Sequence, residues 1–258
     1  SSVGVLVTIS QYRRGLYSGR EAAVIATNFS IVSIAFAYVI VETAGLAAYF
    51  FPFYAVLTLS GVACAILTPR LPPLSLKRDD LLAEHPLRAK DDAAHGLKRA
   101  WSNALTRADT APGPAALSRM IGYNVLDIWL GLIPAAMVIA TVSIALAETT
   151  PLFDWLGWPF AQLLELFQVE SAREAAPAMV IGFADMFLPA LIAADIASPE
   201  TRFIIAVVAV GQLIFMSEVG VLILKSALPL NFVDLVLVFV LRTLIILPIA
   251  VAGAALVF

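Results

Sequence analysis

Apolar residues in this chain are gathered into long blocks separated by short polar stretches. Ala22–Val41 holds no charged residue, and Leu46–Leu67 follows it after a polar turn at Glu42–Gly45. Val125–Ala147 is a third apolar block, with one acid, Asp127, near its start. Because an apolar helix of about 20 residues crosses the hydrocarbon core of a bilayer, we predict a membrane-spanning helix at each of these blocks.

The C-terminal region, residues 177–258, differs because charged side chains lie inside its apolar blocks: Asp185, Glu218, Lys225 and Arg242. A charge at the bilayer centre costs about 3 kcal/mol on insertion scales, so it normally faces a partner or a water-filled cavity. The same blocks are interrupted by three prolines: Pro189, Pro229 and Pro248. Charges and broken helices together predict a polar site inside a membrane. A purely structural network of buried ion pairs is the alternative.

Composition also indicates an integral membrane protein. Hydrophobic residues make up 61% of the chain and charged residues 14%, and the mean hydropathy is +0.93. A soluble domain is usually about 45–50% apolar and about 25% charged. The single cysteine, Cys64, lies in an apolar block and is interpreted as a packing residue. His85 and His95 lie in a charged loop without ligand spacing, so neither a metal site nor a bound cofactor is predicted.

The charge distribution predicts an orientation. Residues 68–124 form a polar loop in which Lys and Arg outnumber Asp and Glu. Such loops stay in the cytoplasm, so we predict a multi-pass protein of the bacterial inner membrane with this loop inside. Within the loop, residues 94–108 have apolar positions at helical spacing, which predicts a surface-lying helix. The interleaved acids of the loop argue against nucleic-acid binding. The third region, 125–176, combines a spanning helix with an amphipathic, Trp-rich segment on the outer side.

Two regions, 1–67 and 177–258, share one pattern: a short membrane element, a capped turn and a polar-faced span. Ser18 opens a Ser-x-x-Glu capping box, and Ser198 is an N-cap followed by a proline. The two spans carry matching polar residues: Asn28 and Ser30 in the first, Gln212 and Glu218 in the second. We therefore predict an all-α, polytopic helical bundle with re-entrant or broken helices and an inverted repeat. The chain opens without an initiator Met, so we expect further spans ahead of the first repeat.

A resemblance to a known family is carried by seven segments: SSVGVLVT, YSGREAAVIATNFSIVSIAF, PLFDWLGWPF, GFADMFLPA, TRFIIAV, SEVGVLILKS and LRT. With these segments the chain resembles the YjiH family of bacterial inner-membrane proteins, across most of its length except residues 75–118. That family carries the gate, or nucleoside-recognition, domain, which is shared with concentrative nucleoside transporters. The resemblance implies that Ser1–Ser10 ends a first re-entrant hairpin and that Gly182–Ala194 is part of a second. Where those transporters carry a Gln-Thr-Glu signature, this chain has Ser1-Ser2-Val3-Gly4, so their nucleoside contacts are not reproduced.

Asp185 is the first candidate for a functional residue because Gly182 and Pro189 flank it and favour unwound backbone. Free carbonyls beside a carboxylate could bind Na⁺ or a proton. The candidate substrate- or ion-binding residues are Asp185, Glu218, Asn28, Ser30, Gln212 and Ser2, with Lys225 and Arg242 as counter-charges. For the small polar residues, packing between helices is the alternative role.

Several enzyme motifs are absent from the sequence, and their absence argues against the corresponding classes of enzyme. The chain has no phosphate-binding G-x-x-x-x-G-K-[ST] loop, no G-x-S-x-G and no H-E-x-x-H, so we expect a protein that is not an enzyme. We predict a transporter, or its core, that moves a small polar solute by ion-coupled alternating access, with a nucleoside-like compound as one candidate solute. The alternative is a membrane scaffold or one half of a hetero-oligomeric gate-domain complex. Expected partners are the lipid bilayer, the solute, and a second copy or a second gate-domain chain.

Overall fold

The computed structural model describes residues 2–29, 32–82, 101, 105, 113–127, 129–130 and 133–258, and all regular structure in them is helical. The first half contains α1 Ser2–Arg13, α2 Gly19–Asn28, α3 Ile34–Thr43 and α4 Phe50–Leu67, with short 3₁₀ turns at Ala47–Tyr49, Thr68–Arg70 and Leu74–Leu76. The second half contains α6 Pro114–Asp127, α7 Ile133–Thr149, α8 Leu152–Leu166, α9 Ala172–Ile181, α10 Leu188–Ala194, α11 Pro199–Gln212, α12 Val221–Leu224 and α13 Phe232–Val257.

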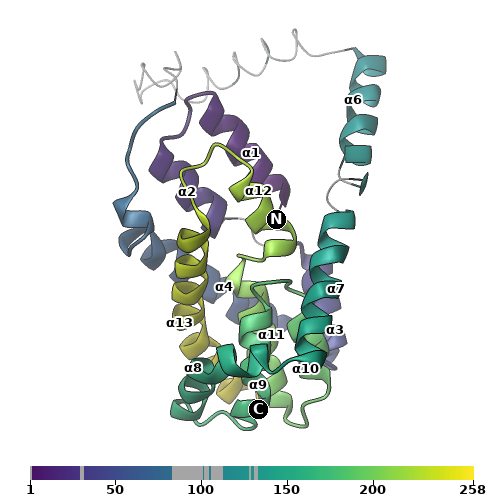
Figure 1. Ribbon diagram of the computed structural model, residues 1–258, viewed down its shortest axis with the longest axis vertical. Helices are drawn as coiled ribbons and strands as arrows, with labels where there is room; N and C mark the ends of the chain where they lie inside the picture. Colours follow the sequence, from purple (N-terminus) through teal and green to yellow (C-terminus); the bar gives the residue numbers. More distant parts are fainter. Residues whose placement is uncertain are drawn as a thin grey trace.

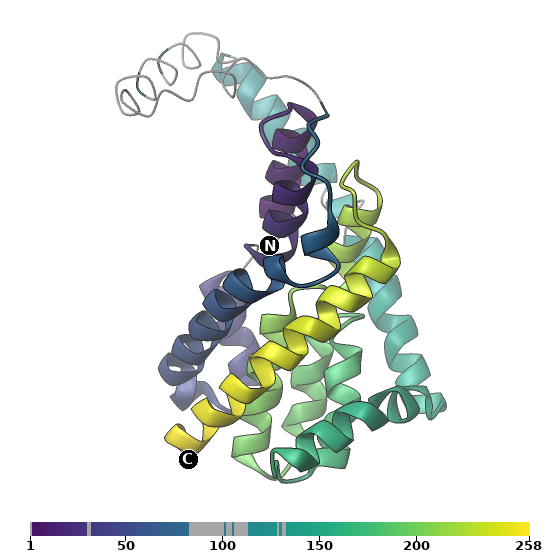
Figure 2. The same ribbon diagram turned by 90° about the vertical axis from the view of Figure 1, so that its left-hand side faces the viewer.

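Three helical segments are long and apolar enough to cross a membrane: Ala47–Arg70, Pro199–Leu224 and Phe232–Val257. The chain is therefore a membrane protein by the length and composition of its helices. The first of the three covers the predicted span at Leu46–Leu67 except for its first residue. The second is the most enclosed, because 72% of its most apolar window is buried inside the molecule. This central segment packs against α13, α4, α9 and α10 (Figures 1 and 2).

The predicted span at Ala22–Val41 is wrong as a single helix. α2 ends at Asn28 and α3 begins at Ile34, after Ser33 caps it by accepting a hydrogen bond from the Phe36 N–H (3.3 Å). An N-cap hydroxyl stabilises a new helix start, so the backbone can leave and re-enter the helix here. The predicted break at Pro248 is also wrong, because α13 runs through it. Buried neighbours such as Leu247 and Ala250 hold the helix together across the lost hydrogen bond.

The prediction that Gly182–Ala194 is not one uninterrupted helix is confirmed. α9 ends at Ile181, residues 182–187 are non-helical, and α10 begins with Pro189 in its first turn. α9 and α10 pack against each other as a hairpin, with the non-helical residues at its tip. α11 stops at Gln212, where Leu213 takes a left-handed conformation (φ 58°). A π-helical turn at 216–220 and α12 continue beyond it.

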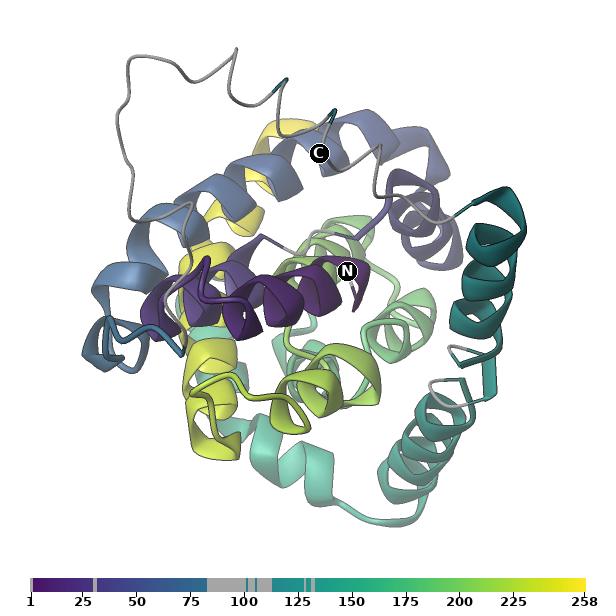
Figure 3. The same cartoon turned by 90° about the horizontal axis from the view of Figure 1, so that it is seen from above.

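α6 and α7 lie along one side of the bundle, and Figure 3 shows them away from α13. The predicted span at Val125–Ala147 begins in α6 and continues in α7, with residues 128, 131 and 132 outside the described part. The predicted surface helix at 94–108 lies almost entirely outside the described residues. The amphipathic segment at 148–176 forms α8, which lies across one end of the bundle (Figure 2).

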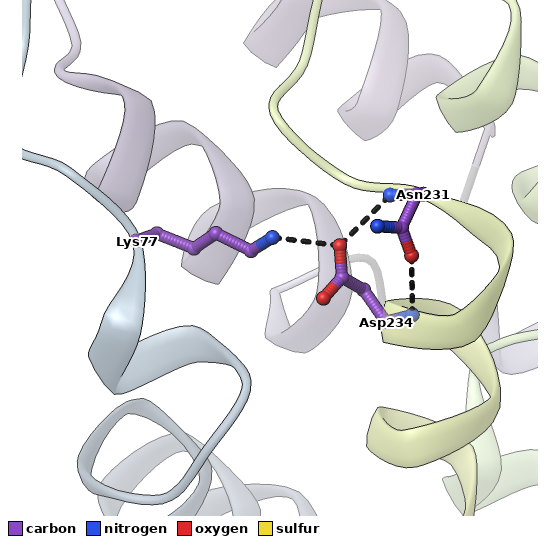
Figure 4. Close-up of polar contacts among 3 residues, drawn as sticks. All are labelled: Lys77, Asn231 and Asp234. Carbon is purple, nitrogen blue, oxygen red and sulfur yellow. Dashed lines mark hydrogen bonds and ion pairs between the residues drawn. The ribbon is translucent and has the colours of Figure 1, made fainter.

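Residues 77–80 are called the strap below, and they lie toward the end of the molecule opposite α8. The Lys77 ammonium lies 2.6 Å from a carboxylate oxygen of Asp234, which also accepts the N–H of Asn231 (2.9 Å) in the capping box of α13 (Figure 4). Carbonyls of the strap accept the first two N–H groups of α2, from Gly19 (2.9 Å) and Arg20 (3.0 Å). Ser18 caps the same helix as predicted. The strap therefore joins the N-termini of α2 and α13.

Candidate functional site

The centre of the candidate site is Arg242 on α13, whose side chain is fully buried. Its Nε and Nη2 atoms donate to the carbonyl oxygen of Gly211, at 2.9 and 2.6 Å. Its Nη1 atom donates to the carbonyl oxygen of Thr27 (3.2 Å) and to the side-chain oxygen of Asn28 (2.7 Å). One guanidinium thus joins α13 to the last residues of α2 and α11.

Two helix C-termini account for the burial of this charge. The last carbonyls of a helix have no partner within it, and its C-terminal end carries a partial negative charge. α2 and α11 both end beside the guanidinium, so their carbonyls solvate it in place of water. Within the described part of the chain no carboxylate forms an ion pair with Arg242. The prediction that Lys225 or Arg242 is a counter-charge to Asp185 and Glu218 stays a prediction.

Polar side chains around Arg242 extend the network, and together with it they are called the polar cluster: Thr27, Asn28, Thr68, Gln212, Arg242 and Thr243. The Thr68 hydroxyl donates to the Asn28 side-chain oxygen at 2.6 Å, which brings the end of α4 to the end of α2. The Gln212 amide nitrogen donates to the Met179 carbonyl oxygen (3.1 Å) and the Thr243 hydroxyl (2.8 Å). Asn28 and Gln212 therefore hold equivalent places, each as the last residue of an interrupted helix.

The side-chain oxygen of Gln212 is buried, and no donor among the described residues reaches it. It faces the hairpin tip, where a Cβ atom added to Gly182 would lie 2.4 Å from it. Real Cβ contacts do not come this close, so the tip can approach α11 only because residue 182 is glycine. An unpaired buried acceptor costs about 1–3 kcal/mol.

The two interrupted segments cross beside the polar cluster. The Met216 N–H donates to the Phe183 carbonyl oxygen (2.7 Å), and the Ser217 N–H donates to the Ala184 carbonyl oxygen (2.9 Å). Asp185 and Glu218 each follow these bonded residues by one position, so both predicted acids lie next to the crossing in the sequence. Both are half-buried. One Asp185 carboxylate oxygen accepts the Phe187 N–H at 2.8 Å, which fixes the turn before α10.

The remaining predicted site residues are Lys225, Ser30 and Ser2. Lys225 is exposed at the C-terminal end of α12 and is not part of the polar cluster. Ser30 lies outside the described residues, and the side chain of Ser2 is not described. Among the described residues, no group of three or more His, Cys, Asp or Glu could hold a metal ion.

Sequence reasoning missed the three threonines of the polar cluster: Thr27, Thr68 and Thr243. Each looks like an ordinary small polar residue in or beside an apolar helix. One signal was available, because a lone Arg242 inside α13 requires several acceptors from elsewhere. Local spacing could not say which residues supply them.

Comparison with known proteins gives one relative. No protein-family model matches the chain, and no solved structure matches it. The chain is 46% identical over 253 residues to a protein of Alkalihalophilus pseudofirmus that is described as uncharacterized. The match covers 97% of this chain and 55% of the relative, so the chain spans little more than half the length of that protein. The description of the relative gives no substrate.

Proposed function

We propose that the chain forms the core of a transporter that moves a small polar solute across a membrane by ion-coupled alternating access. The observation that carries this proposal is the crossing of two interrupted segments, with Asp185 and Glu218 beside it. Irregular backbone at membrane depth is tolerated where it is buried in protein or lines a polar cavity, and transporters bind their ions and substrates at such breaks.

The two acids are the proposed site of the coupling ion. Transporters bind their coupling ions beside interrupted helices, and carboxylate oxygens there suit a proton or a cation such as Na⁺. The Asp185 carboxylate has one oxygen committed to the Phe187 N–H, which leaves the other for an ion. The coupling ion would thereby hold the hairpin tip against the turn that carries Glu218.

The polar cluster is the proposed boundary of the solute site. Gln212 offers a buried acceptor toward the hairpin tip, which suits a hydroxyl or amine donor on a small polar solute. Arg242 is bound on several sides by carbonyl groups, so we assign it the role of holding α2 and α11 in place. The resemblance of GFADMFLPA and SEVGVLILKS to the gate domain agrees with these roles and would make the α9–α10 hairpin re-entrant.

The charges at the two ends agree with a position in a bacterial cytoplasmic membrane. Exposed basic residues gather near the strap: Arg13, Arg14, Arg70 and Arg78. Exposed acids gather near the end that holds α8: Asp154, Glu165, Glu170 and Asp195. Positively charged ends remain in the cytoplasm, so we assign the strap to the inside and α8 to the outside.

One observation favours a second candidate, a scaffold or one half of a larger gate-domain complex. α6 and α7 expose large apolar side chains such as Ile121 (52%), Met137 (64%) and Val138 (63%). A face of this kind suits a second gate-domain chain or another copy as well as lipid. In this alternative the polar cluster only holds the helices together.

The deciding experiment is uptake of a panel of polar solutes, nucleosides included, into proteoliposomes of the full-length protein under a Na⁺ or a proton gradient. We expect gradient-driven uptake that Asp185→Asn abolishes without loss of folding. Asp195→Asn is the matched control, because this exposed acid lies at the other end of the same hairpin. Uptake that is unchanged in Asp185→Asn would refute the coupling site. Folded protein that moves no solute until a second gate-domain chain is added would support the alternative.

A further inference from the structure

α8 has three distinct faces. Gly157, Ala161 and Leu164 are buried where α8 packs on α9. A Cβ atom on Gly157 would lie 3.1 Å from the backbone of Ala176, so this glycine permits close approach of the two helices. At 3.6 residues per turn, Trp155 and Leu166 project from the opposite side of α8, away from the bundle.

The outward face is strongly apolar and aromatic. Trp155 is 76% exposed, Trp158 is 65% exposed and Leu166 is 74% exposed. The two indoles border an open hollow of about 290 Å³ that Leu156 and Pro159 also line. Leaving such a surface in water is unfavourable, and a monomeric soluble protein rarely does so.

The charged side chains of α8 lie on one flank, between the buried face and the outward face. Asp154 and Glu165 are eleven positions apart, which is close to three helical turns, so they share one side. Glu165 also pairs with Arg173 at 3.0 Å on the surface. The exposed part of α8 is thus divided into an apolar sector and an ionic sector, as in helices that lie in the plane of a membrane interface.

The position of α8 in the fold indicates that its outward face contacts the lipid bilayer. Figures 1 and 2 show α8 across the lower end of the molecule, at the end where α13 also finishes, and across the direction of α11. This is the level at which the long apolar helices end, and Trp side chains are enriched at that level of a bilayer. We propose that α8 lies in the headgroup region of the bilayer, with Trp155 and Trp158 at the acyl-chain boundary and Asp154 in water.

With α8 at the headgroups, the depth of other segments in the bilayer follows from their distance from α8. α9 has 10 residues and starts directly after the turn that follows α8. Its length is therefore about 15 Å, half of a hydrocarbon core of about 30 Å. The non-helical residues 182–187 then lie near the middle of the bilayer. The placement of α8 is independent of any transport activity.

Tryptophan fluorescence tests the placement. Full-length variants that keep Trp155 or Trp158 as the single tryptophan are placed in phosphatidylcholine nanodiscs whose acyl chains are brominated near the headgroup or near the methyl end. We expect the shallow label to quench both indoles about twofold more strongly than the deep label, because interfacial helices sit about 5–10 Å deep. The matched control carries its single tryptophan one position earlier, by Asp154→Trp, and should be quenched by aqueous acrylamide instead.

Three results would overturn the proposal. Stronger quenching of Trp155 and Trp158 by the deep label would place α8 inside the hydrocarbon core. Quenching by acrylamide to the same extent as the Asp154→Trp control would place the indoles in water. Protection from both bromine labels and from acrylamide would show that another protein chain, such as a second copy, covers this face.

Discussion

The Nη1 atom of Arg242 lies 2.7 Å from the side-chain oxygen of Asn28, although the two residues are 214 positions apart. The contact joins the middle of α13 to the end of α2, where the first apolar block is interrupted. Thr68 donates to the same oxygen at 2.6 Å. An amide oxygen at the end of a broken helix is thus held between a guanidinium and a hydroxyl, and this arrangement fixes the position of the break.

Arg242→Lys should destabilise the protein by about 3 kcal/mol, because a single ammonium cannot reach Gly211 and Asn28 together and leaves buried acceptors unpaired. The measurement is the free energy of unfolding in detergent. Arg14→Lys, at an exposed position, serves as the control and should change it by less than about 0.5 kcal/mol.

The same series distinguishes the hydrogen-bonded arrangement from a buried ion pair. If Arg242 were paired with Asp185, neutralising both residues would restore most of the stability lost on neutralising one. Because carbonyl groups hold Arg242, we expect no rescue of Arg242→Gln by Asp185→Asn. A double variant as stable as the wild-type protein would contradict this arrangement.

Gly182→Ala should cost about 1–3 kcal/mol of stability, since its Cβ atom would lie 2.4 Å from the side-chain oxygen of Gln212 and force the hairpin tip away from α11. Gly122→Ala in α6 is the matched control, because no atom of the described residues lies within 4 Å of the added atom there. Alanine favours helix by up to about 1 kcal/mol, so this control should be neutral or stabilising. Equal melting temperatures for the two variants would show that the tip does not contact Gln212.

Asp234→Ala should cost more stability than Lys77→Ala. Both changes remove the ion pair of 2.6 Å, whose side chains are only 18% and 10% exposed, so each change leaves one largely buried charge without its partner. Only the change at Asp234 also removes the side-chain half of the capping box of α13, worth about another 1 kcal/mol. Denaturant unfolding of the two single variants and the double variant measures the difference. Equal costs would mean that the cap contributes nothing.

The two ends of the molecule should be accessible from opposite sides of the membrane. We expect a membrane-impermeant maleimide to label Gln168→Cys in intact cells, and to label Arg78→Cys only after the membrane is opened. Both positions are exposed, so accessibility of the side chain itself does not limit either reaction. Labelling of Arg78→Cys from outside would reverse the orientation that the basic residues indicate.

Local sequence rules predicted those features whose physical cause lies within a few residues. The long apolar blocks at Leu46–Leu67 and in α13 follow from side-chain hydrophobicity alone. The caps at Ser18 and Ser198 depend on hydrogen bonds to the third following residue, and both are present. The interruption after Gly182 follows from a glycine and a proline around an acid. Each of these predictions needed only residues that lie a few positions apart in the sequence.

Only the tertiary structure decided what the interior polar groups do. A charge within an apolar block indicates that a hydrogen-bonding or charged partner is required, but packing between helices determines which residue is that partner. Arg242 takes its acceptors from residues 31 to 215 positions away, and the sequence pattern favoured carboxylates instead of carbonyls. The continuation of α13 past Pro248 and the break after Asn28 have the same origin. Long-range burial and hydrogen bonding outweigh the local preference of the backbone at both places.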